Sequence, residues 1–243
     1  EEIDSTNRLV RDLARDGSPE GTVVIAREQT EGRGRRGRGW FSLPEKSLVF
    51  SLLLRPTSIG PVHCPQIALV SALALSLSLE RIGLLPGLKW PNDVLLGGKK
   101  TAGILLESSL ERNEVNWVII GVGINVNMEE ADFPPMLRGK ATSLRIEKGE
   151  FVEKEQIITS FFSFFREWYA RWRKPGEDRA LQEAYTRRLV GKGEPIFLRG
   201  TGEVLEGRME GIDEEGALLV FTKSGLRRFQ WGEVSFCAAQ KRQ

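Results

Sequence analysis

Cysteine and histidine are scarce in this chain of 243 residues, which contains two cysteines and one histidine. Cys64 and Cys237 lie far apart and belong to no CxxC pair, so the sequence signals neither a disulfide framework nor a zinc site. His63 has no second histidine to act with, which argues against a histidine-based catalytic triad and a multi-histidine metal centre. We therefore expect no dedicated metal site.

Long apolar runs and an excess of charge are missing as well. The longest apolar run, residues 67–79, is shorter than the roughly 20 residues that span a bilayer, and no signal peptide precedes Glu1. We expect a cytoplasmic protein that does not contact a membrane. The 35 lysines and arginines nearly balance 33 aspartates and glutamates, and the net charge of +2 argues against a general nucleic-acid binder.

Positive charge is concentrated in one short stretch, GRGRRGRGW at residues 32–40. So much glycine disfavours both helix and strand, because each glycine loses much backbone freedom on ordering. Glycine also lets backbone N–H groups approach an anion, while a guanidinium donates paired hydrogen bonds to phosphate or carboxylate. We predict a mobile loop that becomes ordered around an anion. A solvated basic loop and an RNA-binding arginine–glycine tract are the alternatives.

The remainder of the first 190 residues shows helix and strand patterns. DSTN at residues 4–7 offers good N-cap residues before a helical pattern that ends at Gly17. Apolar and β-branched runs predict strands, the first two of them buried, at 22–26, 47–54, 94–96, 101–106 and 117–127. Apolar residues at helical spacing predict helices at 65–83, 151–172 and 177–189, with a break at 174–176.

A rigid corner is predicted at residues 88–93, LKWPND. Its proline bars a regular central strand, which leaves Lys89, Asn92 and Asp93 as polar groups around a turn. A hairpin follows, with two glycines and two lysines at 97–100 between its strands.

Two glycines interrupt the strand predicted at 117–127. Glycine inside a strand indicates close approach by a ligand or by a neighbouring chain, so Gly121 and Gly123 point to a pocket. An exposed sheet edge near 115–127 is also a candidate surface for a homodimer.

After Gly191 the pattern changes to short strands separated by glycine-containing turns, including one at 200–202. Strands are predicted at 195–199, 203–212, 217–222, 226–231 and 234–236. Five short strands in about 50 residues are typical of a small SH3-like β-barrel. We therefore predict an α+β protein with one domain at residues 1–190 and a second at residues 191–243.

Taken together, the motifs resemble the biotin protein ligase family. GRGRRGR at 32–38, KWPND at 89–93, KxAGIL at 100–105 and GxGIN at 121–125 follow one another in this order, preceded by DSTN. The resemblance extends from Asp4 to about Ser235. It implies a mixed β-sheet with helices packed on it, of the class II synthetase and biotin–lipoate ligase kind, followed by the small barrel.

The resemblance implies a cytoplasmic, ATP-dependent ligase that acts in two steps. Biotin and MgATP give biotinyl-5′-adenylate and pyrophosphate, and a lysine of a biotin carboxyl carrier domain then attacks the adenylate to form an amide. The biotin carboxylate and the ATP phosphates repel each other, so positive charge must be aimed at the point of attack. An acyl adenylate hydrolyses readily, so a loop that closes over it has the task of excluding water.

The resemblance also assigns residues, with Mg²⁺ carried by ATP. The residues expected to act in catalysis are Arg35, Lys100 and Asp93, the last as a candidate for deprotonating the incoming lysine. The residues expected to bind biotin are Ser5, Thr6, Asn7, Gln29, Gly32, Arg33, Gly34, Arg35, Lys100 and Gly103. The residues expected to bind ATP or the adenylate are Arg33, Arg35, Arg36, Arg38, Trp40, Lys89, Asn92, Asp93 and Asn125, with Trp40 as an apolar wall.

The chain departs from the family's pattern in two places. Barrels of the family reach ATP with a basic residue shortly after GE[IV]S, whereas here GEVS at 232–235 is followed by Phe236 and Cys237. Some members also carry an N-terminal helix-turn-helix that makes them repressors, whereas this chain opens almost directly on DSTN. We therefore expect no binding to nucleic acid.

Two other functions remain open. One is a lipoate or octanoyl ligase of the same fold, against which the paired GRGRRGR and KWPND motifs argue. The other is a nucleic-acid-binding module that uses the arginine loop and the barrel, but it lacks the interleaved aromatic residues on which bases stack.

Overall fold

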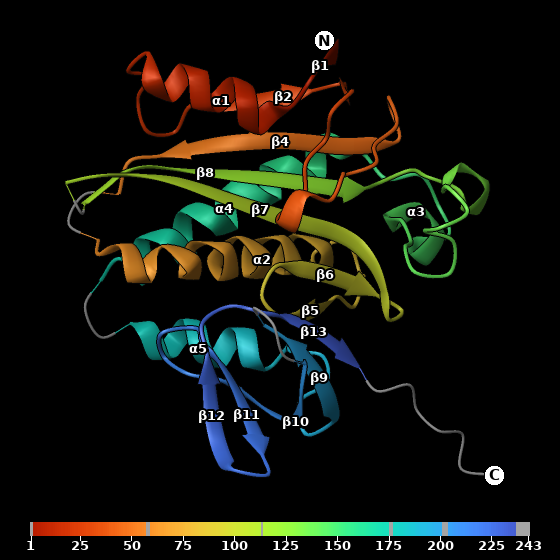
Figure 1. The fold of residues 1–243 in the computed structure, drawn as a ribbon. Coiled ribbons are helices and arrows are strands. Elements are labelled where there is room, and N and C mark those ends of the chain that lie inside the picture. Colours follow the sequence, from red (N-terminus) through yellow and green to blue (C-terminus); the bar gives the residue numbers. More distant parts are fainter. Residues whose placement is uncertain (1, 57–58, 113, 175–176, 201–203, 237–243) are drawn as a thin grey trace.

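A computed structural model describes the chain at residues 2–56, 59–112, 114–174, 177–200 and 204–236. A six-stranded sheet with helices on its faces is followed by a five-stranded sheet, the lower part of Figure 1. The predicted α+β class is confirmed. The elements of the first part are β1 (Glu2–Ile3), α1 (Thr6–Arg15), β2 (Val23–Ala26), β3 (Glu28–Gln29), η1 (Arg35–Gly37), β4 (Ser47–Leu54), η2 (Pro61–His63), α2 (Cys64–Glu80), β5 (Gly87–Lys89), β6 (Asp93–Leu96), β7 (Lys99–Glu111), β8 (Glu114–Asn125), η3 (Glu130–Asp132), α3 (Leu144–Lys148), α4 (Lys154–Trp172) and α5 (Asp178–Thr186).

The six-stranded sheet has the order β2-β4-β8-β7-β6-β5, and every neighbouring pair in it is antiparallel. The expectation of a mixed sheet is wrong in this respect. In the described part of the chain, parallel pairing is limited to β1 with β3 and to two isolated bridges, one of which joins Lys100 to Ala141. Short hairpins such as the one between β6 and β7 return the chain beside itself and so produce antiparallel neighbours.

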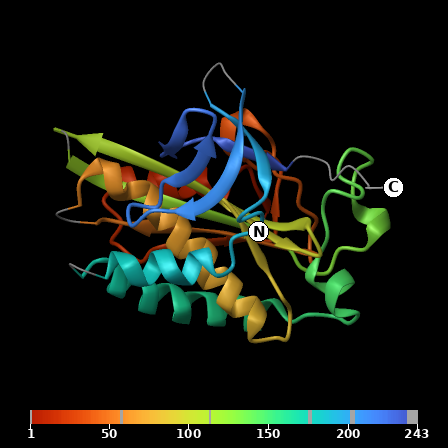
Figure 2. The same cartoon turned by 90° about the horizontal axis from the view of Figure 1, so that it is seen from below.

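Helices α2 and α4 cover one face of this sheet, and α1 covers part of the other (Figures 1 and 2). Strand β4 shows the division, because Phe50 and Leu52 pack in the cluster that contains α2 and α4, whereas Leu53 packs with Val10 of α1. All eight residues of β4 are buried, as expected of a strand that is covered on both faces.

The stretch Pro61–Glu80, which comprises η2 and α2, is long and apolar enough to cross a membrane by length and composition. However, 78% of its most apolar part is buried inside the protein. Helices α2 and α4 pack together beneath the sheet, which explains why α2 is apolar on all sides. The core helix predicted at 65–83 is confirmed.

Two predictions about strands are wrong. The sequence predicts that β2 is buried, but β2 is an edge strand and Ile25 is 56% exposed. Composition does not distinguish a buried central strand from an edge strand, because β-branched residues favour both. The sequence also predicts an exposed edge near 115–127, whereas residues 118–124 pair with β4 on one side and β7 on the other. A homodimer stays a prediction that does not rest on this edge.

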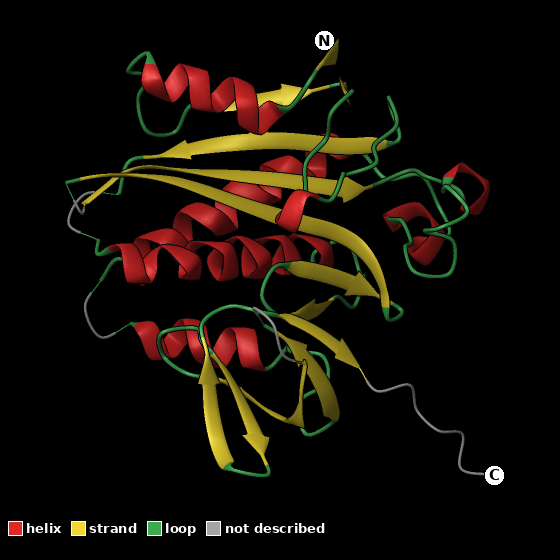
Figure 3. Cartoon of the chain, in the orientation of Figure 1, coloured by secondary structure: helices red, strands yellow, loops and turns green. Residues whose placement is uncertain are grey.

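The second sheet has the order β12-β11-β10-β9-β13, again antiparallel (Figure 3). Its strands are β9 (Pro195–Arg199), β10 (Val204–Ile212), β11 (Leu218–Thr222), β12 (Gly225–Phe229) and β13 (Glu233–Phe236). All five predicted strands are confirmed to within two residues at each end. The predicted break and turn include residues 175–176 and 201–202, which lie outside the described residues. The domain boundary at residue 190 stays a prediction.

Candidate active site

The floor of the candidate site is the sheet face that carries α1 and the arginine–glycine loop (residues 32–40). A cavity of about 290 Å³ lies there, and glycines of β7 and β8 form part of its floor. A Cβ on Gly123 would stand 2.4 Å from Trp40 Cε2, and a Cβ on Gly121 would stand 2.1 Å from Asn7 Oδ1. The predicted close approach at these glycines is present, and the approaching groups are side chains of the same chain.

Neutral groups line one end of the cavity. The Thr6 N–H and hydroxyl at the start of α1 lie 2.8 and 2.9 Å from Gln29 Oε1. Behind them, the fully buried Ser51 hydroxyl lies 2.7 Å from Thr6 Oγ1 and 2.6 Å from Asn7 Oδ1. Ser5 is the N-cap residue of α1, yet its side chain makes no capping hydrogen bond. The DSTN segment therefore contributes to the cavity and does more than begin a helix.

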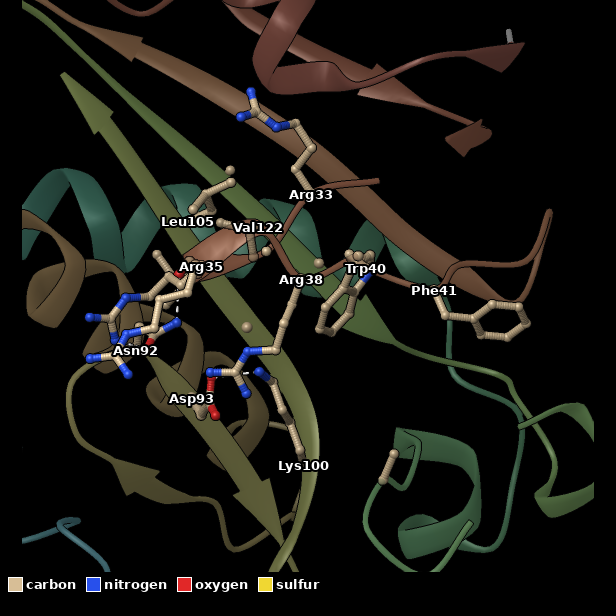
Figure 4. Close-up of a pocket in the computed structure, with 18 of the residues that line it drawn as sticks. Arg33, Arg35, Arg38, Trp40, Phe41, Asn92, Asp93, Lys100, Leu105 and Val122 are labelled. Carbon is tan, nitrogen blue, oxygen red and sulfur yellow. Dashed lines mark hydrogen bonds and ion pairs between the residues drawn. The ribbon is translucent and has the colours of Figure 1, made fainter. Parts of the chain in front are cut away.

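Charged groups line the other end. Lys100 Nζ lies 2.6 Å from Asp93 Oδ1 and 5.6 Å from the centre of the Trp40 ring. Arg35 donates a hydrogen bond of 2.8 Å to Asn92 Oδ1 (Figure 4). The KWPND corner thus presents one amide and one carboxylate, each already engaged by a cation.

A β-bulge aims Lys100 at this end. Residues 100 and 101 of β7 together oppose Leu95 of β6, because the pairing register shifts by one residue there. Lys100 Nζ consequently lies 3.1 Å from where a Cβ on Gly103 would stand, over the floor of the cavity. Gly103 leaves room for the lysine.

The arginine–glycine loop closes over the cavity as a short hairpin around η1. The Gly34 N–H donates to the Arg38 carbonyl at 2.7 Å, and Arg36 and Gly37 adopt left-handed backbone angles, with φ of 57° and 72°. The sequence predicts a loop without regular structure, but its glycines also permit a tight turn of this kind. Ordering around an anion stays a prediction.

The arginines of this loop point in different directions. Arg35 reaches the corner at Asn92, and burial, followed by the charge of Arg36, lowers the pKa of its guanidinium. Arg33 points away from that corner in Figure 4, and its Nη1 lies 3.2 Å from Glu107 Oε1. The loop therefore brings one partly buried guanidinium to the charged end of the cavity.

Two other loop arginines reach the second sheet. Arg38 Nη2 lies 2.8 Å from Glu233 Oε2, and Arg36 Nη2 lies 3.3 Å from the Arg199 carbonyl. Burial alone would raise the pKa of Glu233, but the hydrogen bond and charge of Arg38 and the charge of Arg36 lower it. The C-terminal domain thus meets the site through a carboxylate. Phe236 and Cys237 stand where the family's basic residue is expected, and Cys237 lies outside the described residues.

The sequence-based prediction misses one wall of the cavity, formed by the segment between β8 and α3. Phe133, Leu137, Lys140 and Ala141 line it, and three of these pack in a small cluster with Phe41 and Leu43, which follow the arginine–glycine loop. The sequence did contain one signal for this wall, namely apolar residues in a segment that shows no helix or strand pattern. Ser51 and Glu107, which hold lining residues from behind, are missed as well.

All but one of the predicted site residues line the cavity. The exception, Gly32, lies at the neck of the loop, where a Cβ would stand 2.4 Å from the Trp40 carbonyl oxygen. Asn125 lines the cavity, and its amide donates to the Thr142 carbonyl at 3.0 Å. The predicted residues brought together here are Ser5, Thr6, Asn7, Gln29, Arg33, Gly34, Arg35, Arg36, Arg38, Trp40, Lys89, Asn92, Asp93, Lys100, Gly103 and Asn125.

Comparison with known proteins gives two family matches. Residues 1–125 match the biotin/lipoate A/B protein ligase family, and residues 193–237 match the biotin protein ligase C-terminal domain. The two matches follow one another in the chain, as the catalytic sheet and the five-stranded domain do.

Individual relatives agree. The chain is 37% identical to the biotin–[acetyl-CoA-carboxylase] ligase of Paracoccus denitrificans, over 96% of this chain and 97% of the relative. It is 37% identical to the bifunctional ligase/repressor BirA of Bacillus spizizenii, over 96% of this chain and 71% of the relative. The biotin protein ligase of Aquifex aeolicus in complex with biotin and ATP superposes with a TM-score of 0.83 at 30% identity, covering 98% of this chain and 97% of that one. The chain therefore belongs to the biotin/lipoate A/B protein ligase family and is an enzyme of the biotin–[acetyl-CoA-carboxylase] ligase class.

Proposed function

We propose that the chain activates biotin with ATP to biotinyl-5′-adenylate under a closed arginine–glycine loop and then transfers the biotinyl group to a carrier lysine. The crystallised relative from Aquifex aeolicus holds biotin and ATP, and the relative from Paracoccus denitrificans is named for acetyl-CoA carboxylase. The acceptor is accordingly the biotin carboxyl carrier domain of a carboxylase. We also propose that the reaction takes place in the cytoplasm.

The neutral end of the cavity suits the cyclic urea of biotin. A urea is uncharged and needs precisely placed hydrogen-bond partners, and Thr6 and Gln29 lie beside the N-terminus of α1 as partners for its N–H groups. The glycine floor and the Trp40 ring provide an apolar surface for the thiophane ring and the valeryl chain. The carboxylate of biotin then points toward the charged end.

The partly buried cation at the charged end is the observation that carries the proposal. Burial lowers the pKa of Arg35, so its charged form lacks full solvation until an anion arrives. Lys100 lies at the same end, beside Asp93. Together they stabilise the charge that develops when a carboxylate oxygen of biotin attacks the α-phosphorus of ATP and pyrophosphate leaves.

Mg²⁺ enters this proposal with ATP. Among the described residues, no group of three or more histidine, cysteine, aspartate or glutamate side chains gathers in a way that would hold a metal. Asp93 and Asn92 are oxygen donors within the cavity, and oxygen donors suit an ion that keeps several of its waters. These two side chains would fill one or two coordination positions of Mg²⁺, and the ion would neutralise phosphate charge there.

In the second step, the carrier lysine attacks the acyl carbon, a C–N bond forms, and AMP leaves with the oxygen that joined it to the acyl group. The amine must lose a proton, and Asp93, a carboxylate at the charged end of the cavity, would accept it once Lys100 binds phosphate oxygen instead. The loop over the cavity protects the adenylate from water in the interval.

An ATP–pyrophosphate exchange assay tests the first step. Labelled pyrophosphate should enter ATP when biotin is present, and lipoate should neither support the exchange nor compete with biotin. Exchange that depends on lipoate would overturn the assignment in favour of a lipoate ligase. For the second step, labelled biotin should appear on an apo carrier domain and be absent from a carrier whose acceptor lysine is replaced by arginine.

A further inference from the structure

A row of four oxygen atoms lies along the neutral end of the cavity. Gln29 Oε1, Thr6 Oγ1, Ser51 Oγ and Asn7 Oδ1 follow one another with separations of 2.9, 2.7 and 2.6 Å. Gln29, Thr6 and Asn7 line the cavity, whereas Ser51, on β4, is fully buried and does not. Each separation is the length of a hydrogen bond, and each requires one proton.

The far end of the row is fixed by Glu107. Its carboxylate lies 2.8 Å from Asn7 Nδ2 and is also paired with the guanidinium groups of Arg11 and Arg33, at 3.3 and 3.2 Å. A carboxylate accepts hydrogen bonds and does not donate them, so the amide nitrogen of Asn7 must face Glu107. The amide oxygen consequently faces Ser51 and acts as an acceptor.

The near end is fixed by the backbone. The Thr6 N–H donates at 2.8 Å to the Gln29 side chain, which must therefore present its oxygen. The Gln29 nitrogen lies instead toward the loop, 3.3 Å from where a Cβ on Gly32 would stand. The row thus begins and ends with an amide oxygen, and neither oxygen brings a proton.

Three hydrogen bonds along the row would need three protons, but the row has only two, those of the Thr6 and Ser51 hydroxyls. If Ser51 donates to Thr6, the Asn7 oxygen loses this donor although the residue is only 3% exposed. An unsatisfied buried acceptor costs about 1–3 kcal/mol, so Ser51 donates to Asn7. The Thr6 hydroxyl can then donate to Gln29 Oε1 or to Ser51 Oγ, and only the second choice satisfies the buried Ser51 oxygen, because Gln29 Oε1 already accepts the Thr6 N–H. The separation without a proton then lies between Thr6 Oγ1 and Gln29 Oε1, beside the cavity.

We propose that Ser51 and Glu107 are positioning residues that make Thr6 Oγ1 and Gln29 Oε1 a pair of acceptors and so select ligands that present N–H groups to them. The inference rests on the proposed function, because the cyclic urea of biotin carries two ring N–H groups. The specificity is set behind the cavity wall, by residues that the ligand does not touch.

The test compares biotin with its cyclic carbamate analogue, in which one ring N–H is replaced by a ring oxygen. Wild type should bind biotin at least about 100-fold more tightly than the carbamate in titration calorimetry, because the carbamate places an acceptor against an acceptor. In Ser51→Ala, the Thr6 proton turns to Gln29. Binding of biotin should then weaken by roughly 10-fold or more, and the preference over the carbamate should fall below about 10-fold.

Two further variants serve as controls. Ser78→Ala removes another fully buried serine hydroxyl, one that donates to its own helix at the Ala74 carbonyl, and should change neither affinity. Ser51→Cys keeps a weak donor and should recover part of the preference, and it supplies the measurement if Ser51→Ala does not fold. Thermal unfolding establishes that each variant is folded.

The outcomes separate this inference from the proposed function. If wild type binds biotin but the Ser51 variants keep the full preference for it over the carbamate, the inference is wrong and the function stands. Equal binding of biotin and carbamate by wild type likewise overturns the inference. If wild type does not bind biotin, the proposed function fails first.

Discussion

The two ends of the cavity are built on different principles. At the neutral end, Thr6 and Ser51 are 3% and 0% exposed and are joined by hydrogen bonds between hydroxyl and amide groups. At the charged end, the side chain of Lys100 is 36% exposed and that of Arg38 is 61% exposed, and both are held by ion pairs. Ion pairs between exposed groups contribute little to stability, whereas buried polar groups are costly to leave unpaired.

This difference indicates how each end works. The neutral end is complete before a ligand arrives and offers one pattern of acceptors, so it selects. The charged end consists of cations whose present partners, Asn92, Asp93 and Glu233, are exchangeable for phosphate and carboxylate oxygens at small cost. Affinity for the vitamin and stabilisation of reacting charge are therefore separable by mutation.

Removal of Lys100 is the strongest test of that separation. Lys100→Ala should lower the rate of adenylate formation by about 1,000-fold, because a cation aimed at the developing charge is lost. The midpoint of thermal unfolding should change little, since the pair with Asp93 is partly exposed. Single-turnover formation of labelled adenylate measures the rate.

The neighbouring lysine supplies the control. Lys99→Ala changes a residue outside the cavity and should keep normal rates. A large fall in the unfolding temperature of Lys100→Ala, in parallel with its activity, would show that Lys100 is structural and that the two ends are not separable in this way.

The contact between Trp40 and the glycine floor of the cavity is tested at Gly123. Gly123→Ala places a methyl group 2.4 Å from Trp40 Cε2, so the indole ring must move. Affinity for biotin and the rate of adenylate formation should both fall, by about 10- to 100-fold, because Trp40 lines the cavity above the glycine floor and lies beside Lys100. Quenching of tryptophan fluorescence by biotin gives the affinity.

Gly60→Ala is the matched control, because a Cβ there meets its nearest atom at 3.7 Å and Gly60 lies outside the cavity. Unchanged binding of biotin by Gly123→Ala would mean that Trp40 does not border the ligand.

Replacement of Arg35 should affect retention of the adenylate more than binding of biotin. Arg35→Gly should release the adenylate faster, by about 10-fold, so that lysines of unrelated proteins become labelled, because the guanidinium that reaches Asn92 no longer holds the anion. The ratio of label on bystander protein to label on the carrier domain measures this leakage.

Arg33→Gly provides the comparison within the same loop. Its guanidinium points to Glu107, away from the charged end, so leakage should be smaller. Equal leakage from the two variants would mean that closure of the loop as a whole, and not Arg35, retains the adenylate.

The smallest effect concerns the contact between the loop and the C-terminal domain. The pKa of Glu233 is lowered from its ordinary value of 4.5, so its contribution to stability is present above pH 4.5 and is lost as the pH falls through the lower, folded value. Glu233→Gln should lower the unfolding temperature by no more than about 2 °C at pH 7, and the difference should vanish in acid below the folded value. Scanning calorimetry over this pH range measures it, and a difference that persists in acid would exclude the ion pairs as its cause.

Much of the site is predictable because its residues lie in short motifs with distinctive chemistry. GRGRRGR and KWPND show by their composition a group of cations and a polar corner, whereas the full set of site residues comes from the resemblance of all the motifs to a known family. Sixteen of these residues line one cavity. The direction in which each side chain points is not predictable in the same way. Arg33 and Arg35 are two residues apart in the loop, yet one pairs with Glu107 and the other with Asn92.

By itself, the sequence determined the order of the longer helices and strands and the five short strands between residues 195 and 236, because these depend on local propensity and spacing. Its motifs supplied the residues of the site through their resemblance to a known family. Only the tertiary structure decided that β2 is an edge and β8 is central, that a bulge aims Lys100 over Gly103, and that Ser51 and Glu107 stand behind Thr6 and Asn7. Each of these depends on which strands become neighbours and in which register. Strand pairing in the six-stranded sheet joins residues as far apart in the chain as Ser47 and Asn125, and no local pattern specifies it.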